Sequence, residues 1–358
     1  MRFLIDLGHP AHVHYFKNFI WQMEEKGHEF ILVARDKEVL YQLLDNYKFS
    51  YVKRGKGGKS FLAKLLYILK ADFIIYRLAL RFKPDLFLSF ASAYAAHAAW
   101  LYRKPHVVFD DTEHAKFELM LYAPFSETIL NPKPFWKSYS NNQLYFDGYM
   151  ELTHLVPKYF TPDPLVLKQY GVDIEEKFFI VRFVSWDASH DMGQTGLTLK
   201  QKQNVVELLQ RHGKVLISSE SKLPENLEQF KIKINPVHLH HFLANAQLYI
   251  GEGATTAAES IILGTPAIYI NTLDAGTISE QSEKYGLISL RKSDQIIPII
   301  QDLLLTDYKQ KALVYRDLIR KDKIDVTSFM VWLLNEYPKN KFVFKENPEI
   351  QYQFKIEN

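Results

Sequence analysis

Short apolar runs alternate with helix-like segments along most of the chain. The run RFLIDL precedes the helix-like YFKNFIWQMEEKG, and EFILVA precedes DKEVLYQLLDNY. The alternation continues with DLFLSF and HVVFDD, and later with FFIVRFV, KVLISS, LYIGEG and PAIYIN. Strands that alternate with helices indicate a parallel sheet covered on both faces, and short apolar strands fit that burial. The pattern therefore predicts an α/β protein.

A proline-rich stretch interrupts this alternation near the middle of the chain. VPKYFTPDPLV carries three prolines between Pro157 and Pro164, and each restricts its own backbone and that of the preceding residue. We predict two Rossmann-like α/β/α domains, 1–157 and 165–307, joined by this linker, with a ligand bound in a cleft between them. Residues 308–358 are predicted to form C-terminal helices and a tail.

The composition restricts the functions that the chain can have. It has 358 residues, 47% of them hydrophobic, and its net charge is only +3, so the charge balance does not call for nucleic acid as a partner. No cysteine is present, which excludes disulfides, thiol catalysis and cysteine metal sites. No apolar run approaches the roughly 20 residues of a membrane-spanning helix. We therefore expect a cytoplasmic protein, with peripheral attachment to the inner membrane face left open.

The stretch GEGATTAAESIILGTPAIYIN, at 251–271, combines a glycine turn with the start of a helix. Thr255 or Thr256 is expected to cap this helix, while Gly253 would let the backbone approach a ligand. The remaining amides and the positive end of the helix dipole would form an anion site. An ordinary strand–turn–helix connection would use the same residues. The dinucleotide pattern G-x-G-x-x-G fails because Thr256 replaces its third glycine.

Segment 249–286 resembles the donor-binding segment of GT-B enzymes, a superfamily that includes the peptidoglycan N-acetylglucosaminyltransferase and the UDP-N-acetylglucosamine 2-epimerases. It is particularly similar to an uncharacterised bacterial and archaeal family related to both, and the similarity runs from Arg2 to about Asp307. The resemblance implies a GT-B fold and a nucleotide-sugar substrate, most simply UDP-linked. It assigns donor binding to Gly253, Ala254, Thr255 and Thr256 for the diphosphate, Glu259 for the ribose, and Glu280 and Gln281 for the sugar or its phosphate.

Three histidines follow the first predicted strand, in the segment DLGHPAHVHYF. They are His9, His12 and His14. Inverting sugar transfer requires a base for the acceptor hydroxyl, and an imidazole titrates in the useful range. Related transferases have a histidine on this loop, and the resemblance aligns it with His12, with His9 as the alternative. The histidines could instead cap the helix and bond locally, whereas the lack of a Glu-x-x-His pattern disfavours a metal site.

An acidic patch follows a later strand, in HVVFDDTEHAKFE. It contains Asp110, Asp111, Glu113 and His114, at a strand end where parallel sheets present functional loops. Neighbouring carboxylates can raise one another's pKa and act as acid or base. The 2-epimerases have a catalytic glutamate in a similar loop, and the resemblance maps it to Glu113. Asp111 and Glu113 are therefore catalytic candidates beside His12, and a solvated acidic turn is the alternative.

Two further segments of the second half carry candidate ligands. In VRFVSWDASHD, the resemblance suggests phosphate contacts by Arg182, Ser185 and His190, although the epimerase sequence histidine-arginine-arginine-glutamate-asparagine is absent. In VHLHHFLANAQ, His238, His240 and His241 lie where GT-B loops contact the nucleotide base. Histidines on a helix face are also commonly structural.

The segment from Lys53 to Lys83 is basic, with nine Lys or Arg and a single acid, Asp72. It lacks the P-loop pattern because Lys53 stands where the first glycine would be. A basic, apolar helix after a glycine loop could rest on an anionic bilayer, which would suit a lipid-linked acceptor. A core helix with a solvated basic face is the alternative.

These observations together predict a GT-B glycosyltransferase that uses a nucleotide sugar and modifies an envelope polysaccharide or a lipid-linked acceptor. Neither a cofactor nor an obligatory metal is expected, because helix amides can stabilise the departing diphosphate. A UDP-N-acetylglucosamine 2-epimerase and a non-catalytic nucleotide-sugar-binding protein remain the alternatives.

Overall fold

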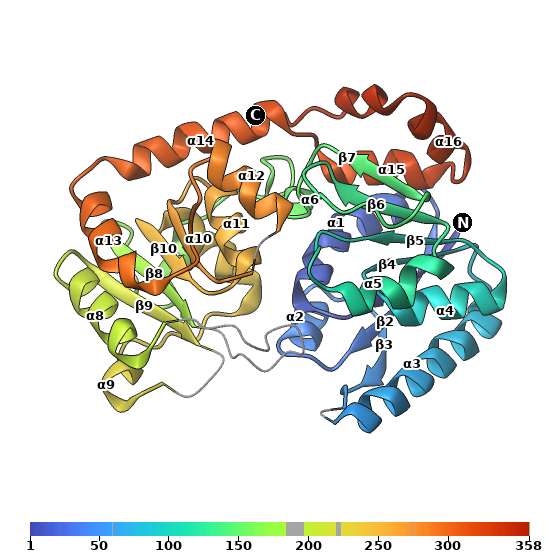
Figure 1. Ribbon diagram of the computed structural model, residues 1–358, viewed down its shortest axis with the longest axis horizontal. Coiled ribbons are helices and arrows are strands. Elements are labelled where there is room, and N and C mark those ends of the chain that lie inside the picture. The colour runs from blue at the N-terminus through green and yellow to red at the C-terminus, as the bar shows by residue number, and fades with distance from the viewer. Residues whose placement is uncertain (59, 184–196, 220–222, 274, 358) are drawn as a thin grey trace. The chain divides into compact units, whose positions relative to one another are not determined.

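The computed structural model describes residues 1–358 except 59, 184–196, 220–222, 274 and 358 (Figure 1). The chain divides into two compact units. Unit 1 comprises Met1–Tyr159 and Lys323–Ile356, and unit 2 is formed by Phe160–Asp322. Across the described residues, no helix has both the length and the apolar character needed to cross a bilayer.

Unit 1 contains a sheet of seven parallel strands in the order β3-β2-β1-β4-β5-β6-β7. The strands are β1 (Arg2–Leu7), β2 (Glu29–Arg35), β3 (Tyr51–Gly55), β4 (Leu86–Phe90), β5 (His106–Phe109), β6 (Thr128–Pro132) and β7 (Gln143–Phe146). The central β1 is almost entirely buried, and its Ile5 pairs with Leu32 on one side and Leu88 on the other. The strand order reverses direction between β1 and β4, which defines the topological switch point of this sheet.

Helices cover the unit 1 sheet. They are α1 (Pro10–Glu25), α2 (Leu40–Asn46), α3 (Phe61–Phe82), α4 (Ala93–Tyr102), α5 (Lys116–Tyr122) and α6 (Leu152–Leu155), with a short η1 (Ala123–Phe125). Local sequence explains where the long helices start. Pro10 is at the first position of α1, and the Ser92 hydroxyl caps α4 by accepting from the Ala95 amide at 3.3 Å.

Unit 2 contains five parallel strands in the order β12-β11-β10-β8-β9. The strands are β8 (Phe178–Phe183), β9 (Lys214–Ser219), β10 (Leu248–Gly251), β11 (Ala267–Ile270) and β12 (Ile288–Leu290). The surrounding helices are α7 (Leu165–Lys168), α8 (Leu199–Gln210), α9 (Glu225–Glu228), η3 (Pro236–His238), α10 (Leu239–Asn245), α11 (Ala254–Ile262), α12 (Gly276–Lys284), η4 (Ser293–Gln295), α13 (Ile296–Leu304) and α14 (Tyr308–Asp322). This sheet switches direction between β8 and β10, as in doubly wound folds.

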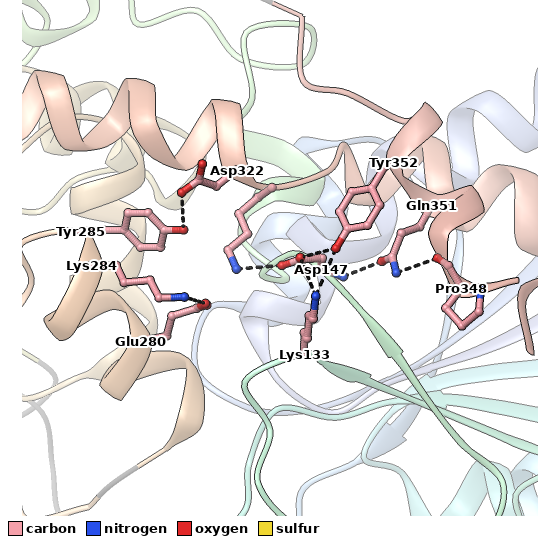
Figure 2. Close-up of polar contacts among 10 residues, drawn as sticks. Lys133, Asp147, Glu280, Lys284, Tyr285, Asp322, Pro348, Gln351 and Tyr352 are labelled. Carbon is pink, nitrogen blue, oxygen red and sulfur yellow. Dashed lines mark hydrogen bonds and ion pairs between the residues drawn. The ribbon is translucent and has the colours of Figure 1, made fainter.

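The C-terminal segment is divided between the units. Helix α14 belongs to unit 2, where the Tyr285 hydroxyl donates to Asp322 at 3.0 Å (Figure 2). The chain after Asp322 belongs to unit 1 and forms α15 (Val326–Asn335), α16 (Lys339–Glu346) and η5 (Pro348–Gln353). Residues 308–358 therefore do not form a compact unit of their own, and the predicted tail is largely helical.

A polar network centred on Asp147 attaches this returning segment to unit 1 (Figure 2). The Asp147 carboxylate accepts from Lys323 at 2.8 Å and from the Tyr352 hydroxyl at 2.7 Å, while its backbone amide donates to Gln351 at 2.6 Å. Lys133 lies 3.4 Å from the same carboxylate. These groups hold the pKa of Asp147 below its ordinary value despite burial, so the network is ionic at neutral pH.

Two all-parallel sheets with covering helices confirm the predicted fold class, two Rossmann-like α/β domains.

Candidate functional site

Both sheets have a topological switch point, and ligands of open α/β sheets bind at the carboxyl ends of the strands there. In unit 1 this point lies after β1 and β4, beside the loop that carries His9 and His12. In unit 2 it lies after β8 and β10, beside the turn that leads into α11. The predicted Ser185 and His190 follow β8 and lie outside the described residues.

Helix α11 begins without a side-chain cap. Gly253 is its N-cap residue, so the expectation that Thr255 or Thr256 caps the helix is wrong; both threonines lie within the first turn. The Ala257 amide donates to the Gly253 carbonyl at 3.3 Å, as in a regular first turn. No described residue accepts a hydrogen bond from the amides at 253–256. This helix start can therefore bind an anion.

The turn before α11 is fixed by buried contacts. Gly251 has no room for a side chain, because a Cβ there would lie 2.1 Å from the Tyr249 hydroxyl. Glu252 is buried; its carboxylate accepts from the Leu197 amide at 2.8 Å, and its carbonyl accepts from Asn271 at 3.2 Å. The start of α11 is thereby attached to the neighbouring β11 and to the segment before α8.

Glu259 lies one turn further along α11 and is 4% exposed. One carboxylate oxygen lies 2.9 Å from Nε2 of the buried His240 on α10. The predicted ribose ligand thus already has a protein partner, and any sugar hydroxyl would have to share the carboxylate with this imidazole.

Helix α12 packs against α11 and carries the other two predicted sugar ligands. Glu280 forms an ion pair with Lys284 one turn along the helix, at 3.0 Å (Figure 2). Gln281 is completely buried, and neither its amide oxygen nor its amide nitrogen has a hydrogen-bond partner among the described residues. A buried amide without partners costs about 1–3 kcal/mol of stability. Gln281 is therefore a strong candidate for a ligand contact.

In unit 1, the switch-point loop forms local hydrogen bonds. His9 caps α1, with Nδ1 accepting from the Ala11 amide at 3.2 Å. Nδ1 of His12 accepts from the Gly8 amide at 3.2 Å, and its ring packs against Phe90 at the end of β4, with ring centroids 4.9 Å apart. Burial, with the charges of Lys37 and Arg54, lowers the pKa of His12 to about 3. The neutral ring therefore carries its proton on Nε2, which has no hydrogen-bond partner among the described residues.

A base would require the unprotonated nitrogen of His12 to face the substrate, whereas the Gly8 bond places it toward the protein. The geometry therefore suits a neutral imidazole that donates a hydrogen bond through Nε2–H. The assignment of His12 as the base stays a prediction, and this hydrogen bond does not favour it.

A buried ion pair lies beneath the same loop. The Arg54 guanidinium donates to both oxygens of Asp6, at 2.8 and 3.2 Å, and the Ser92 hydroxyl donates to Asp6 at 2.5 Å. Asp6 and Arg54 are almost fully buried. Sequence reasoning missed this pair, although a charged residue inside an otherwise apolar strand is a recognisable signal for a paired buried group.

The acidic patch follows β5. Asp110 is 2% exposed and accepts from the Tyr122 hydroxyl at 2.5 Å and from the Thr112 amide at 3.0 Å. Burial raises the pKa of Asp110 to about 7 and that of the half-buried Asp111 to about 6. Glu113 is buried, and its carbonyl accepts from Lys137. The predicted acidic turn is thus largely buried, and burial brings the pKa values of Asp110 and Asp111 toward neutral pH.

The other histidines have structural partners. His14 stacks on His154, with ring centroids 5.1 Å apart. His238 accepts from or donates to the Tyr170 hydroxyl at 2.9 Å, and His241 accepts from the Asp163 amide at 2.9 Å. These contacts suit the structural alternative for His238 and His241. Arg182, on β8, donates to Ser218 at 3.3 Å.

Unit 1 also has an open cavity of about 1270 Å³ at the opposite edge of its sheet. Its lining includes Asp85, Pro105 and Glu127, each of which directly precedes a strand. Because parallel sheets bind substrates at the carboxyl ends of their strands, this cavity is not the candidate site.

The chain belongs to the family described as Protein of unknown function (DUF354), which matches residues 1–331. It is 25% identical over 317 residues to the uncharacterised protein MJ0665 of Methanocaldococcus jannaschii, a match that covers 84% of this chain and 91% of that protein. The predicted membership of an uncharacterised GT-B-related family is confirmed.

Solved structures of low sequence identity share the fold. The UDP-GlcNAc 2-epimerase of M. jannaschii, solved with UDP-GlcNAc and UDP, has a TM-score of 0.63 at 13% identity and covers 89% of this chain and 99% of its own. The Neisseria meningitidis UDP-GlcNAc 2-epimerase has a TM-score of 0.65 at 13% identity, with 87% and 94% covered. The spinosyn rhamnosyltransferase SpnG has a TM-score of 0.59 at 15% identity, with 93% and 100% covered. These likenesses establish the GT-B fold.

Proposed function

We propose that this protein is a GT-B-type glycosyltransferase that moves a sugar from a nucleotide donor, most simply UDP-linked, to an envelope polysaccharide or a lipid-linked acceptor. The observation that carries the proposal is the start of α11. Its first amides have no acceptor among the described residues, and they lie at the switch point of the unit 2 sheet. A diphosphate is among the anions that such a helix start binds.

Residues around α11 would complete the donor site. The amides of Gly253, Ala254, Thr255 and Thr256 would hold the diphosphate and stabilise its charge as it departs, which requires neither a cofactor nor an obligatory metal.

Side chains of α11 and α12 would bind the rest of the donor. Glu259 would share its carboxylate between His240 and the ribose. Glu280 and Gln281 would bind the sugar or its phosphate, and the buried Gln281 amide would gain the partners that it otherwise lacks. Ser185 and His190 remain proposed phosphate contacts.

In unit 1, His12 would donate a hydrogen bond to the substrate through Nε2–H and would not remove the proton of the acceptor hydroxyl. The base for the acceptor hydroxyl would then be a carboxylate of the acidic patch, Asp111 or Glu113. Asp111 is the better candidate, because a pKa of about 6 leaves it ionised at neutral pH and still basic enough to accept a proton.

The first test is nucleotide binding. Calorimetry and thermal unfolding with UDP, GDP, CMP and dTDP sugars should show one preferred nucleotide, most simply UDP. Because binding to the folded state alone stabilises it, a saturating ligand should raise the unfolding temperature. Failure of all four classes to bind would refute the proposal.

A 2-epimerase is the second candidate, because the raised pKa values of Asp110 and Asp111 would let these carboxyl groups move a proton at C2 of the sugar. Incubation with UDP-N-acetylglucosamine alone separates the two reactions. Conversion to the manno epimer would indicate an epimerase, whereas inertness until an acceptor is added would indicate a transferase. UDP binding that survives His12→Ala, with no turnover in the parent protein, would indicate a non-catalytic binding protein.

A lipid-linked acceptor would bring the protein to a membrane surface. The proposal therefore includes peripheral contact with an anionic membrane through the segment from Lys53 to Lys83.

A further inference from the structure

Helix α3 has two apolar faces, and only one of them is buried. Ile75 and Ala79 pack into the core of unit 1 with Phe87 of β4 and with Ala98 and Ala99 of α4. Elsewhere on the helix lies an apolar stripe of five large side chains that are each 48–62% exposed. These are Leu65, Leu66, Leu69, Phe73 and Leu80.

The exposed side chains form one continuous stripe. At 3.6 residues per turn, all five lie within an arc of about 100° on the helix surface. The buried residues of α3 lie on the opposite side, so burial in the core does not explain the stripe. An outward helix face in water is normally polar, and large exposed apolar patches mark interaction sites.

Cations border the apolar stripe. Lys70, Arg77 and Arg81 are exposed, and their positions on the helix lie directly beside the stripe. The only acid within Phe61–Phe82 is Asp72, and its carboxylate lies 2.9 Å from Nδ1 of His97 on α4. The stripe therefore presents apolar side chains, and the cations on its border are not neutralised by a carboxylate of α3.

We propose that α3 lies flat on an anionic membrane, with the apolar stripe inserted at the level of the acyl-chain boundary and Lys70, Arg77 and Arg81 against the lipid phosphates. Such a bilayer supplies both an apolar depth and negative charge. A second copy of the chain fits this surface less well, because α3 has no uncommitted carboxylate to meet the cations of a partner. A neutral bilayer leaves the cations unmatched.

The structure also limits which part of the basic segment from Lys53 to Lys83 can contact the membrane. Arg54 is buried in its pair with Asp6, so it cannot contact lipid. The contact surface lies on α3, which packs against α4, and α4 packs against α5 (Figure 1). On α5, Phe117 and Met120 are also exposed.

The test is co-sedimentation of the full chain with vesicles of phosphatidylcholine alone and of phosphatidylcholine with about one third phosphatidylglycerol. The parent protein should bind the anionic vesicles and bind the neutral ones far more weakly. Neutralising the border with K70Q/R77Q/R81Q should lower partitioning by about fivefold per cation, on the order of 100-fold in all. Removing apolar contacts with L69S/F73S should lower it by about tenfold or more per side chain.

Matched variants on exposed positions of unit 2 control for general effects of charge and polarity. These are K168Q/K200Q/K311Q for charge and L305S/V314S for apolar surface, and neither should change vesicle binding. All variants should keep the parent's unfolding temperature within a few degrees, since each changed side chain is exposed.

Three outcomes would overturn the membrane proposal. They are equal binding to neutral and anionic vesicles, absence of binding to both, and control variants that lose as much binding as the α3 variants. Light scattering that shows a dimer abolished by L69S/F73S, without vesicle binding, would identify a second copy as the partner instead. The inference rests on the peripheral membrane contact included in the proposed function and assigns it to one face of α3. Vesicle binding and UDP binding are measured separately, so either can fail alone.

Discussion

Helices α1 and α11 both follow a switch-point strand, yet they begin in opposite ways. In α1, Pro10 has no amide hydrogen, the Ala11 amide donates to the His9 ring, and the His12 amide donates to the His9 carbonyl at 3.0 Å. In α11, no described residue accepts from the amides at 253–256. An equivalent place in two similar sheets therefore does not give equivalent chemistry.

The difference arises from the capping residues. The imidazole of His9 satisfies the start of α1, so the remaining functional group of that loop is the His12 side chain. Gly253, the N-cap residue of α11, has no side chain that could accept from the first amides of the helix. These amides and the helix dipole therefore remain available for an anion. The proposed anion site therefore lies in unit 2, and the side chain proposed for chemistry on the switch-point loop of unit 1 is that of His12.

The largest effect is expected from changing His12. His12→Ala should reduce turnover of the nucleotide sugar that the binding screen selects, measured with acceptor present, by roughly 10²–10⁴-fold with little change in UDP affinity. His12→Gln should stay within roughly tenfold of the parent, because its amide nitrogen can replace the Nε2–H donor. A glutamine variant as inactive as the alanine variant would show that His12 is the base, and near-native rates for both would remove it from the reaction.

A negative charge in the first turn of α11 tests the proposed anion site of unit 2. Thr255→Asp places a carboxylate in the first turn, where it should stabilise the helix by about 0.3–1 kcal/mol. The same charge should weaken UDP binding by roughly 100-fold or more, because like charges in contact cost several kcal/mol. Calorimetry measures the affinity, and Leu199→Asp at the start of α8 is the matched control. Unchanged UDP affinity in the Thr255→Asp variant would place the diphosphate elsewhere.

A third prediction concerns the buried acid of unit 1. Burial raises the pKa of Asp110 from 3.8 to about 7, so the folded state holds this proton more tightly than the unfolded state. Stability from this group is present at low pH and is lost as the pH rises toward 7. Asp110→Asn should therefore gain stability relative to the parent across that window, by up to about 4 kcal/mol.

Thermal unfolding of Asp110→Asn and the parent at about pH 5 and about pH 8 measures this difference. His12 and His106, whose pKa values burial lowers to about 3, act in the opposite direction in both proteins and cancel in the comparison. A stability difference that does not change with pH would mean that Asp110 titrates normally.

The smallest effect is expected at Gln281. Gln281→Leu removes a buried amide without partners among the described residues, so stability should rise by about 1–3 kcal/mol while affinity for UDP-N-acetylglucosamine falls. Denaturant unfolding and calorimetry measure the two changes, with Gln210→Leu on the exposed end of α8 as control. A loss of stability would show that the amide has a structural partner, and unchanged affinity would exclude a ligand contact.

Much of the fold could be predicted because its signals are local. The alternation of apolar runs and helical segments identified parallel sheets, and strand ends identified the loops with Gly253, His12 and Asp111. Partners far apart in sequence could not be predicted in this way. Asp6 meets Arg54, Glu259 meets His240, and Asp147 meets Lys323, each across intervening elements. No periodicity encodes such pairs, since they depend on which elements become neighbours.

The sequence alone determined the fold class of this protein and the position of the glycine turn before α11, because periodicity and glycine act through the backbone within a few residues. Only the tertiary structure decided which amides at the helix starts lack an acceptor among the described residues, and which nitrogen of His12 carries the proton. It also decided to which unit each C-terminal helix belongs. Those outcomes depend on burial and on hydrogen-bond partners, and both are set by contacts that form only after the chain has folded.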